Sequence, residues 1–361
     1  MLLRRLQLRN HRNYAHLDIS MEPGVNVFIG ANGQGKTNLL EAVAMLALSS
    51  SPRARREVEL VGPVAPASRI EAEVESAGRR IELTIALAVD ENRAHRTIEV
   101  DGARRRAVDL PGHFRVTLFW PDDLGLIKAG PEQRRRFLNQ LLVQVEPGYA
   151  RALSGLRRIL EQRNSLLKRI AAGEDSAGGL EVWNLELVRV GMEVADARAA
   201  AVRELAPTAA RCHSEIGGGE RLEIDYLGPP EDLAAAVQNS LGEDLRRGST
   251  SVGPHRDDLR VSLDGHDARG YASQGQQRTA VVSLKLAEAE LVARRTGERP
   301  VLLLDDVLSE LDLERRGALL RQVGNGGQVV ITSVDVGPFP PDLIARASVR
   351  CVEAGQVLPC G

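Results

Sequence analysis

The sequence predicts an α/β protein in which one domain is interrupted by a helical insertion. Two observations place the halves of that domain: a glycine-rich loop follows an apolar run near the start of the chain, and another apolar run ends in two aspartates near its end. A third is the helical periodicity that dominates the stretch between them. We therefore expect one domain formed by residues 1–118 and 251–361, and a second, mainly helical domain formed by residues 119–250.

The glycine-rich loop is the most specific motif in the chain. Residues 30–37 match G-x-x-x-x-G-K-[ST] in full and lie between a strand-like run (25–29) and a helix-like run (38–45). Glycines let the backbone wrap a polyphosphate, so that N–H groups and the positive end of the following helix face its oxygens. We expect Lys36 on the β and γ phosphates of ATP and the Thr37 hydroxyl on Mg²⁺. The expected phosphate-binding residues are Gly30, Ala31, Asn32, Gly33, Gln34, Gly35, Lys36 and Thr37.

The rest of the first 118 residues is strand-rich. Alternating apolar residues flank Ala77-Gly78 and Asp101-Gly102, and both dipeptides are turn signals of β-hairpins. The first part of the chain should therefore combine the glycine-rich loop with an antiparallel sheet.

The insertion carries two helical runs. Apolar residues recur at spacings of three, four and seven within 149–170 and again within 180–201, on either side of a glycine-containing turn at 171–179. This pattern predicts a short antiparallel, coiled-coil-like hairpin with arms of roughly 35–40 Å at about 1.5 Å per residue; an ordinary packed bundle is the alternative. We expect Pro207 to bend or end the second helix.

The second apolar run, residues 301–304, is a buried strand by composition and leads into an acidic pair. Asp305 can hold the shell of a Mg²⁺ ion, and Asp306 can orient or deprotonate the attacking water. Such a pair can also be purely structural. Together with Lys36 and Ser273, these two aspartates are our candidate catalytic residues.

A third motif, residues 271–278, leads into a helix just before the acidic pair. Ser273 by itself would first be interpreted as a helix cap, although a hydroxyl and bare N–H groups at this place can also bind an anion. With the other two motifs, the stretch resembles the signature motif of ABC ATPases, and residues 309–312 resemble their D-loop. The resemblance implies an ABC-type P-loop ATPase head, split in sequence by the arm, and a homodimer that encloses ATP between two heads. The residues expected to act there across the dimer interface are Ser273, Gly275, Gln276 and Asp312.

Charge and cysteine content exclude some classes of protein. Lys and Arg total 47 against 49 Asp and Glu, with a pI near 6.4, so any DNA contact must come from local basic patches. These patches are Arg4, Arg5, Arg9, His11 and Arg12; Arg53, Arg55 and Arg56; Arg104 to Arg106; and Arg134 to Arg136. Arginine runs are more often solvated or paired internally.

Cys212, Cys351 and Cys360 lack metal-site spacing and indicate a reducing cytosol, and no apolar stretch is long enough for a membrane span.

Further stretches narrow the resemblance. Residues 8–14, 121–124, 130–139 and 253–258 resemble sequence stretches of the bacterial RecF family, in the family's order. The resemblance implies a cytoplasmic protein of DNA replication and recombinational repair that dimerises on ATP. It implies binding to double-stranded DNA and to single-strand/double-strand junctions, work with RecO and RecR to load RecA, and weak DNA-stimulated ATPase activity. It also implies that Arg12 and Asn13 lie near the nucleotide.

Several positions depart from these patterns. Asn139 stands where the RecF family usually has Asp, and His11 replaces a common Phe. The acidic pair ends in Asp306 where most ABC ATPases have Glu, and residues 332–333 (Thr-Ser) lack the usual His. These departures favour a timer or clamp over a motor. The roles left open are those of Asp122, Asp123, Asn139, Thr332 and Ser333.

Three other classes share part of this pattern. A transporter-coupled ABC subunit has the ATP motifs, an SMC-type protein needs a far longer coiled coil, and a DNA scaffold could use ATP only to hold a dimer together. We favour the slow ATPase.

Overall fold

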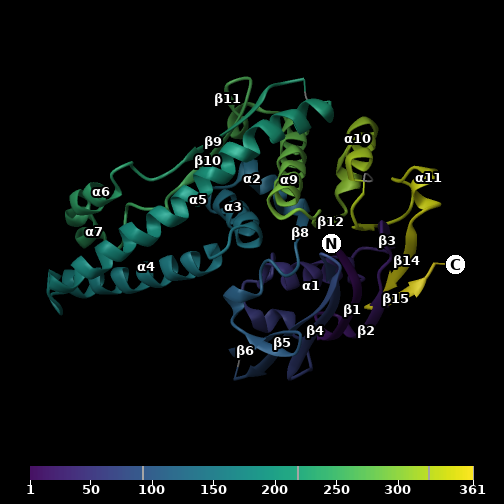
Figure 1. The fold of residues 1–361 in the computed structure, drawn as a ribbon, viewed down its shortest axis with the longest axis horizontal. Coiled ribbons are helices and arrows are strands. Elements are labelled where there is room, and N and C mark those ends of the chain that lie inside the picture. The colour runs from purple at the N-terminus through teal and green to yellow at the C-terminus, as the bar shows by residue number, and fades with distance from the viewer. Residues whose placement is uncertain (92, 218, 324–325, 361) are drawn as a thin grey trace. The chain divides into compact units, whose positions relative to one another are not determined.

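The computed structural model describes residues 1–91, 93–217, 219–323 and 326–360 (Figure 1). Two compact units share the chain: the first holds Met1–Leu124, Arg211–Gly219 and Ser273–Gly361, and the second holds Gly125–Ala210 and Glu220–Ala272. The boundaries differ from those that we expected at 118/119 and 250/251. Residues 251–272 go with the second unit because strand β10 (Asp258–Leu263) pairs with β9 (Leu222–Leu227) inside it.

An antiparallel sheet in the order β2-β1-β4-β5-β6-β7 forms one layer of the first unit. Its strands are β1 (Leu2–His11), β2 (Tyr14–Ser20), β4 (Ala67–Ser76), β5 (Arg79–Asp90), β6 (Arg93–Val100) and β7 (Ala103–Arg105). Both predicted hairpin turns are confirmed. Ala77-Gly78 and Asp101-Gly102 each have two positive φ angles, as a two-residue hairpin turn with the twist of its strands requires.

A second sheet in the order β15-β14-β3-β13-β12-β8 carries the nucleotide motifs. Its strands are β3 (Val25–Ile29), β8 (Val116–Phe119), β12 (Val301–Asp305), β13 (Val329–Ser333), β14 (Ser348–Glu353) and β15 (Gln356–Pro359). All neighbouring strands are parallel except the terminal β14–β15 hairpin. The inner strands β12 and β13 are mostly apolar because both of their faces are covered.

Helices cover the two faces of this second sheet. Helix α1 (Lys36–Leu48) contacts strands of both sheets and therefore lies between them. Apolar residues of α9 (Gln274–Thr296) and α10 (Leu313–Val323) share a core with Leu302, Leu304 and Ile331, on the face away from α1. The short helices of the unit are η1 (Glu57–Leu60), η2 (Ala107–Asp109), η3 (Pro121–Leu124), η5 (Val307–Glu310) and α11 (Pro341–Ile344).

The second unit is mainly helical, as predicted. Its helices are α2 (Gly125–Lys128), α3 (Pro131–Val145), α4 (Tyr149–Ala171), η4 (Ala177–Gly179), most of α5 (Leu180–Glu215), α6 (Leu233–Asn239), α7 (Leu241–Arg247) and α8 (Ala268–Tyr271). A small sheet in the order β11-β10-β9 completes it, with β11 at His266–Asp267.

Helices α4 and α5 form the predicted antiparallel hairpin (Figure 1). The Tyr149 hydroxyl accepts from Arg198 Nε at 3.1 Å near one end, and Arg163 Nε donates to Asn184 Oδ1 at 2.8 Å further along. Of the two outcomes expected at Pro207, a bend or an end, the end is wrong, because α5 runs on to Glu215. Residues on both sides of the proline are fully buried, so packing outweighs the one lost backbone hydrogen bond. Within the described ranges, no helix is long and apolar enough to cross a membrane.

His11 occupies an apolar position at the end of β1. Its side chain is fully buried, and neither ring nitrogen has a hydrogen-bond partner among the described residues. Burial lowers the pKa of this imidazole to about 4, although the nearby Glu41 carboxylate opposes the shift. The neutral ring is thus buried at the cost of two desolvated nitrogens without hydrogen-bond partners.

We expect His11→Phe to raise the free energy of unfolding and to remove an acid sensitivity. The folded pKa of His11 lies below the unfolded value, so the unfolded chain binds more protons between about pH 4 and pH 6.5, and stability falls as the pH drops through that window. This shift corresponds to roughly 3 kcal/mol, and removing the two unpaired ring nitrogens adds about 1 kcal/mol to the free energy of unfolding at neutral pH. Urea unfolding at several pH values measures both, with the exposed His16→Gln as control. An unchanged pH profile in His11→Phe would contradict the assignment.

Candidate nucleotide-binding site

The glycine-rich loop joins β3 to α1 in the predicted strand, loop, helix order. Gly33 and Gly35 have φ angles of 82° and 120°, a left-handed region that disfavours side chains. The loop closes over the side chain of Lys36, whose ammonium donates to the carbonyl oxygens of Gly30 (2.5 Å) and Ala31 (3.0 Å). The loop therefore has the backbone path that anion binding requires.

Two turns distant in sequence brace this loop. The Asn13 amide donates to the Gln34 carbonyl at 2.9 Å, and the N–H of Gly355 donates to the same oxygen at 3.0 Å. The Gln34 side chain accepts from Ala354 N at 2.7 Å. Sequence analysis did not predict this support from the β14–β15 turn. A disulfide between Cys351 and Cys360 closes the same hairpin, with 5.1 Å between the Cα atoms, a pairing that the cysteine spacing did not indicate.

The acidic pair meets the loop at the end of β12. The Thr37 hydroxyl donates to Asp305 Oδ2 at 2.9 Å, and the Thr332 hydroxyl donates to Oδ1 at 2.7 Å. Burial raises the pKa of Asp305, although both hydroxyls and the charge of Arg53 oppose this shift. Residues 332–333 stand where ABC ATPases usually have a histidine. Here the Thr332 hydroxyl holds the Asp305 carboxylate in place.

Asp306 is held differently. Its backbone has a left-handed φ of 51°, and its N–H donates to the Thr332 carbonyl at 3.2 Å. Its Oδ1 atom is buried and has no hydrogen-bond partner among the described residues. Buried carboxylate oxygens normally have hydrogen-bond partners, so this oxygen is able to accept a hydrogen bond from a bound molecule. Burial lowers the pKa of Lys36, although the negative charges of Asp306 and Asp305 oppose this shift.

Arg12 and Asn13 lie in the turn after β1 and differ in what they contact. The Arg12 guanidinium forms a two-pronged ion pair with the buried Glu41 of α1, with both distances 2.9 Å. Asn13 touches the loop itself and accepts from Asn38 Nδ2 at 2.8 Å. Arg12 thus braces α1, while Asn13 contributes directly to the wall of the site.

Arg53 belongs to the site although sequence analysis treated it only as part of a basic cluster. Its guanidinium donates to Asn38 Oδ1 at 3.2 Å and lies 5.8 Å from the ring centre of Trp120. Nothing in the local sequence separates it from the neighbouring arginines. Only the folded position reveals that its charge faces Asp305.

Asp123, whose role the sequence left open, is directed at the protein. Its carboxylate accepts from the Trp120 N–H at 2.7 Å. Burial alone would lower the pKa of Lys285, but the carboxylates of Glu288, its ion-pair partner, and of Asp123 raise that pKa overall. Asp122 beside it is exposed.

The signature-like motif caps helix α9. Ser273 Oγ accepts from the N–H of Gln276 at 3.3 Å, while the Gln276 side chain accepts from Ser273 N at 2.7 Å, so the pair forms a capping box. Gly275 lies beside Arg315, which pairs with Asp312 at 2.6 Å, so the two predicted interface motifs meet within one chain. Helices α9 and α1 cover opposite faces of the sheet, so the signature-like motif lies away from the glycine-rich loop of its own chain. That a second chain brings its signature-like motif to this loop stays a prediction.

The oxygen donors at the loop suit Mg²⁺. Thr37 and Asp305 offer a hydroxyl and a carboxylate, and Mg²⁺ in phosphate sites takes one or two such protein ligands and completes its shell from phosphates and water. Among the described residues there is no group of three or more His, Cys, Asp or Glu side chains that could hold a metal by themselves. A cation here would therefore depend on a bound phosphate ligand.

Comparison with known proteins points to one family. Residues 2–339 match the family described as the RecF/RecN/SMC N-terminal domain. A DNA replication and repair protein RecF from Moorella thermoacetica is 40% identical over 348 residues, which covers 96% of this chain and 93% of that protein. The solved structure of a recombination mediator protein RecF with ATP, in the RecFOR pathway, is similar with a TM-score of 0.91 and 32% identity, covering 99% and 97% of the two chains. An Smc head bound to a ScpA domain is 14% identical with a TM-score of 0.55 over 99% and 96%, a likeness of fold alone.

Proposed function

The chain belongs to the RecF family, with an α/β fold of the ABC ATPase type, and we propose that it is an ATP-dependent DNA-binding protein of recombinational repair. The heads of two chains close on ATP and form a dimer. The closed dimer binds DNA where duplex meets single strand, and slow hydrolysis opens it. One observation carries the proposal: Lys36, Thr37, Asp305 and an unsatisfied Asp306 oxygen converge on one loop.

The chemistry follows from these contacts. Lys36 exchanges the carbonyls of Gly30 and Ala31 for phosphate oxygens, which its ammonium binds more strongly because they are charged. Thr37 and Asp305 would hold Mg²⁺, which would supply positive charge to neutralise the charge on the phosphates during the reaction. Asp306 orients a water toward the γ phosphorus and accepts its proton as the new P–O bond forms and the bond to the β-phosphate oxygen breaks, leaving ADP and phosphate.

Two features support a slow reaction. Asp306 reaches less far than the glutamate common in ABC ATPases. Thr332, one of the two residues at the switch position, already donates to Asp305. A long-lived closed state suits a clamp that must persist on DNA while other proteins assemble.

The proposed partners come from the relatives. The ATP-bound relative is named as a recombination mediator of the RecFOR pathway, which supports RecO and RecR as partners. Loading of RecA onto gapped DNA in the cytoplasm is part of the same proposal and rests on the family resemblance. Weak, DNA-stimulated ATPase activity is part of the same proposal.

Sedimentation with ATP and Mg²⁺ tests whether two chains share each nucleotide. We expect the wild type to pass from monomer to dimer, and Ser273→Arg to bind ATP yet stay monomeric, because the new side chain fills the start of α9 where the partner's phosphate should lie. Ser20→Arg, at an exposed position of β2, should dimerise normally. A wild type that stays monomeric under saturating ATP, or a Ser273→Arg that dimerises fully, would falsify the composite site.

A further inference from the structure

Most side chains of the first basic cluster (Arg4, Arg5, Arg9, His11 and Arg12) are paired or buried within the protein. Its paired members are Arg4 with Glu75, Arg5 with Asp18 and Arg12 with Glu41. His11 is buried. Arg9 is exposed, and no ion pair or hydrogen bond of its side chain occurs among the described residues. One guanidinium of this cluster therefore remains available to a ligand.

The register of the antiparallel sheet sets Arg9 in a basic row. It is directly opposite Arg69 of β4 on one side and His16 of β2 on the other. Like charges at directly opposed positions of neighbouring strands destabilise a sheet. Arg69 offsets part of this repulsion with a 2.9 Å ion pair to Glu71 two residues along its strand, whereas Arg9 has no such partner. An anion bound between the two strands would remove the remaining repulsion.

A hollow of about 320 Å³ lies beside this row on the same sheet. Arg9 and Arg69 border it from β1 and β4, and His95 and Thr97 border it from β6. The remaining lining is mostly small, including Ala67, Ala86 and Ala88. Short side chains let a ligand approach the sheet closely while the arginines reach it from the side.

We propose that this basic hollow, formed by Arg9, Arg69 and His95 around Ala86 and Ala88, binds the phosphate backbone of duplex DNA. The proposal rests on the DNA-binding function proposed above and assigns a surface to it. Guanidinium groups match phosphate oxygens in a two-pronged geometry. The hollow is an open part of a sheet face, where an isolated phosphate ion would keep its hydration, while a polyanion gains from releasing its condensed counterions. Glu71 and Glu99 occupy the next row of the same face, which limits the contact to one or two phosphates.

Salt-dependent DNA binding tests this surface. With saturating ATP, the affinity for a fluorescent duplex oligonucleotide is measured over a range of salt concentrations for the wild type and for Arg9→Gln/Arg69→Gln. We expect the double variant to bind about tenfold more weakly at low salt and to lose about one to two from the slope of log K against log salt. Arg5→Gln is the matched control, since it removes an arginine from the same strand and face that already pairs with Asp18.

The outcomes separate this inference from the wider proposal. Equal slopes in the wild type and the double variant overturn the hollow as a DNA contact, and so does an equal loss in Arg5→Gln. A wild type that dimerises on ATP but binds no duplex overturns DNA binding itself. Unchanged ATP affinity in all variants shows that the nucleotide-binding head remains folded.

Discussion

Asp306→Asn is expected to abolish ATP hydrolysis while leaving ATP binding and ATP-driven dimerisation intact. Asparagine keeps the size of the side chain and one acceptor oxygen, and it tolerates the left-handed φ of 51° at this position better than most residues. It cannot take up a proton from the attacking water. Loss of such a general base slows the chemical step on the order of 10²–10⁴-fold.

Single-turnover phosphate release measures that step directly. Asp335→Asn, which changes an exposed aspartate of the same unit, should hydrolyse at the wild-type rate. Because Asp306→Asn should still close on ATP, we expect it to accumulate as a dimer that persists for the lifetime of the bound nucleotide. A release rate equal to that of the wild type would remove Asp306 from the reaction, and a wild type with no phosphate release would make the protein a non-hydrolysing scaffold.

Short-range patterns predicted much of this structure. The Ala77-Gly78 and Asp101-Gly102 turns form where predicted because their positive φ angles depend on two adjacent residues. The α4–α5 hairpin follows from three-four spacing, and the loop before α1 from its glycines. Each of these features depends on residues close together in the chain, so the sequence pattern contains most of what determines it.

Features that depend on distant residues could not be predicted in this way. The β14–β15 turn supports Gln34 from more than 300 residues away, and β10 joins β9 rather than the head. The charge of Arg53 matters only because folding places it near Asp305. The arginines at 134–135, which we considered as phosphate contacts, instead bond to residues 257–258 inside the second unit.

The motif at residues 253–258 and Asn139 meet in a buried network around Arg198 of α5. Its guanidinium donates to Asp257 Oδ2 at 3.0 Å and to Asn139 Oδ1 at 3.0 Å. The other donors reach the Pro254 carbonyl at 2.7 Å and the Tyr149 hydroxyl at 3.1 Å. A single arginine thus joins α3, α4, α5 and the loop before β10. Asn139 therefore has a structural role here as an acceptor for Arg198 and for the Tyr149 hydroxyl.

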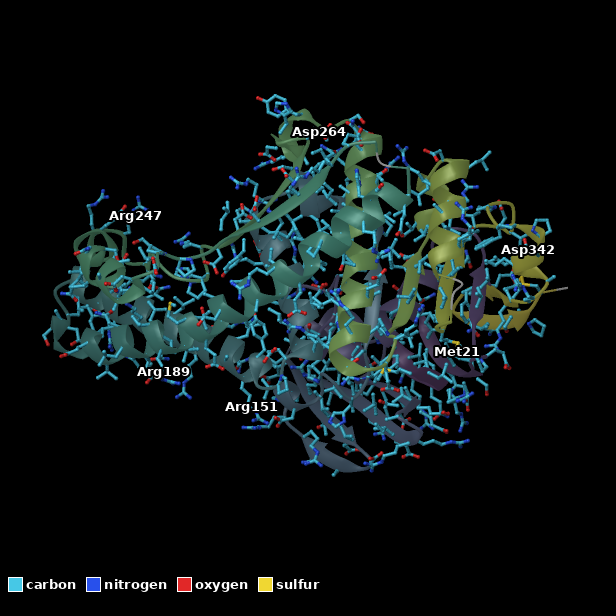
Figure 2. All side chains as sticks on the ribbon, turned by 45° about the horizontal axis from the view of Figure 1, so that its top comes forward. Met21, Arg151, Arg189, Arg247, Asp264 and Asp342 are labelled. Carbon is cyan, nitrogen blue, oxygen red and sulfur yellow. A yellow bond between two sulfur atoms is a disulfide. The ribbon has the colours of Figure 1, made fainter. Side chains whose placement is uncertain are left out.

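We expect Arg198→Met to destabilise the second unit by about 3–5 kcal/mol, because it leaves the buried Asp257 carboxylate without its counter-charge. Arg189→Met is the control on the same helix. Arg189 projects into solvent (Figure 2), and its ion pair among the described residues is with the half-exposed Glu186, so its loss should change stability by less than about 0.5 kcal/mol. Urea unfolding followed by Trp183 fluorescence, in a Trp120→Phe background, reports on this unit.

The pH dependence separates a lost charge pair from a simple packing defect. Burial already raises the pKa of Asp257 in the wild type, although Tyr226 and Arg198 oppose the shift, and removal of Arg198 should raise the pKa further. A carboxyl group whose folded pKa exceeds its unfolded value binds more protons when folded, so its cost to stability fades as the pH falls toward that folded pKa. The destabilisation by Arg198→Met should therefore shrink as the pH falls from neutral toward the raised folded pKa of Asp257, and adding Asp257→Asn should recover part of it at neutral pH. A defect that is the same at every pH would mean that Arg198 acts through its packing alone.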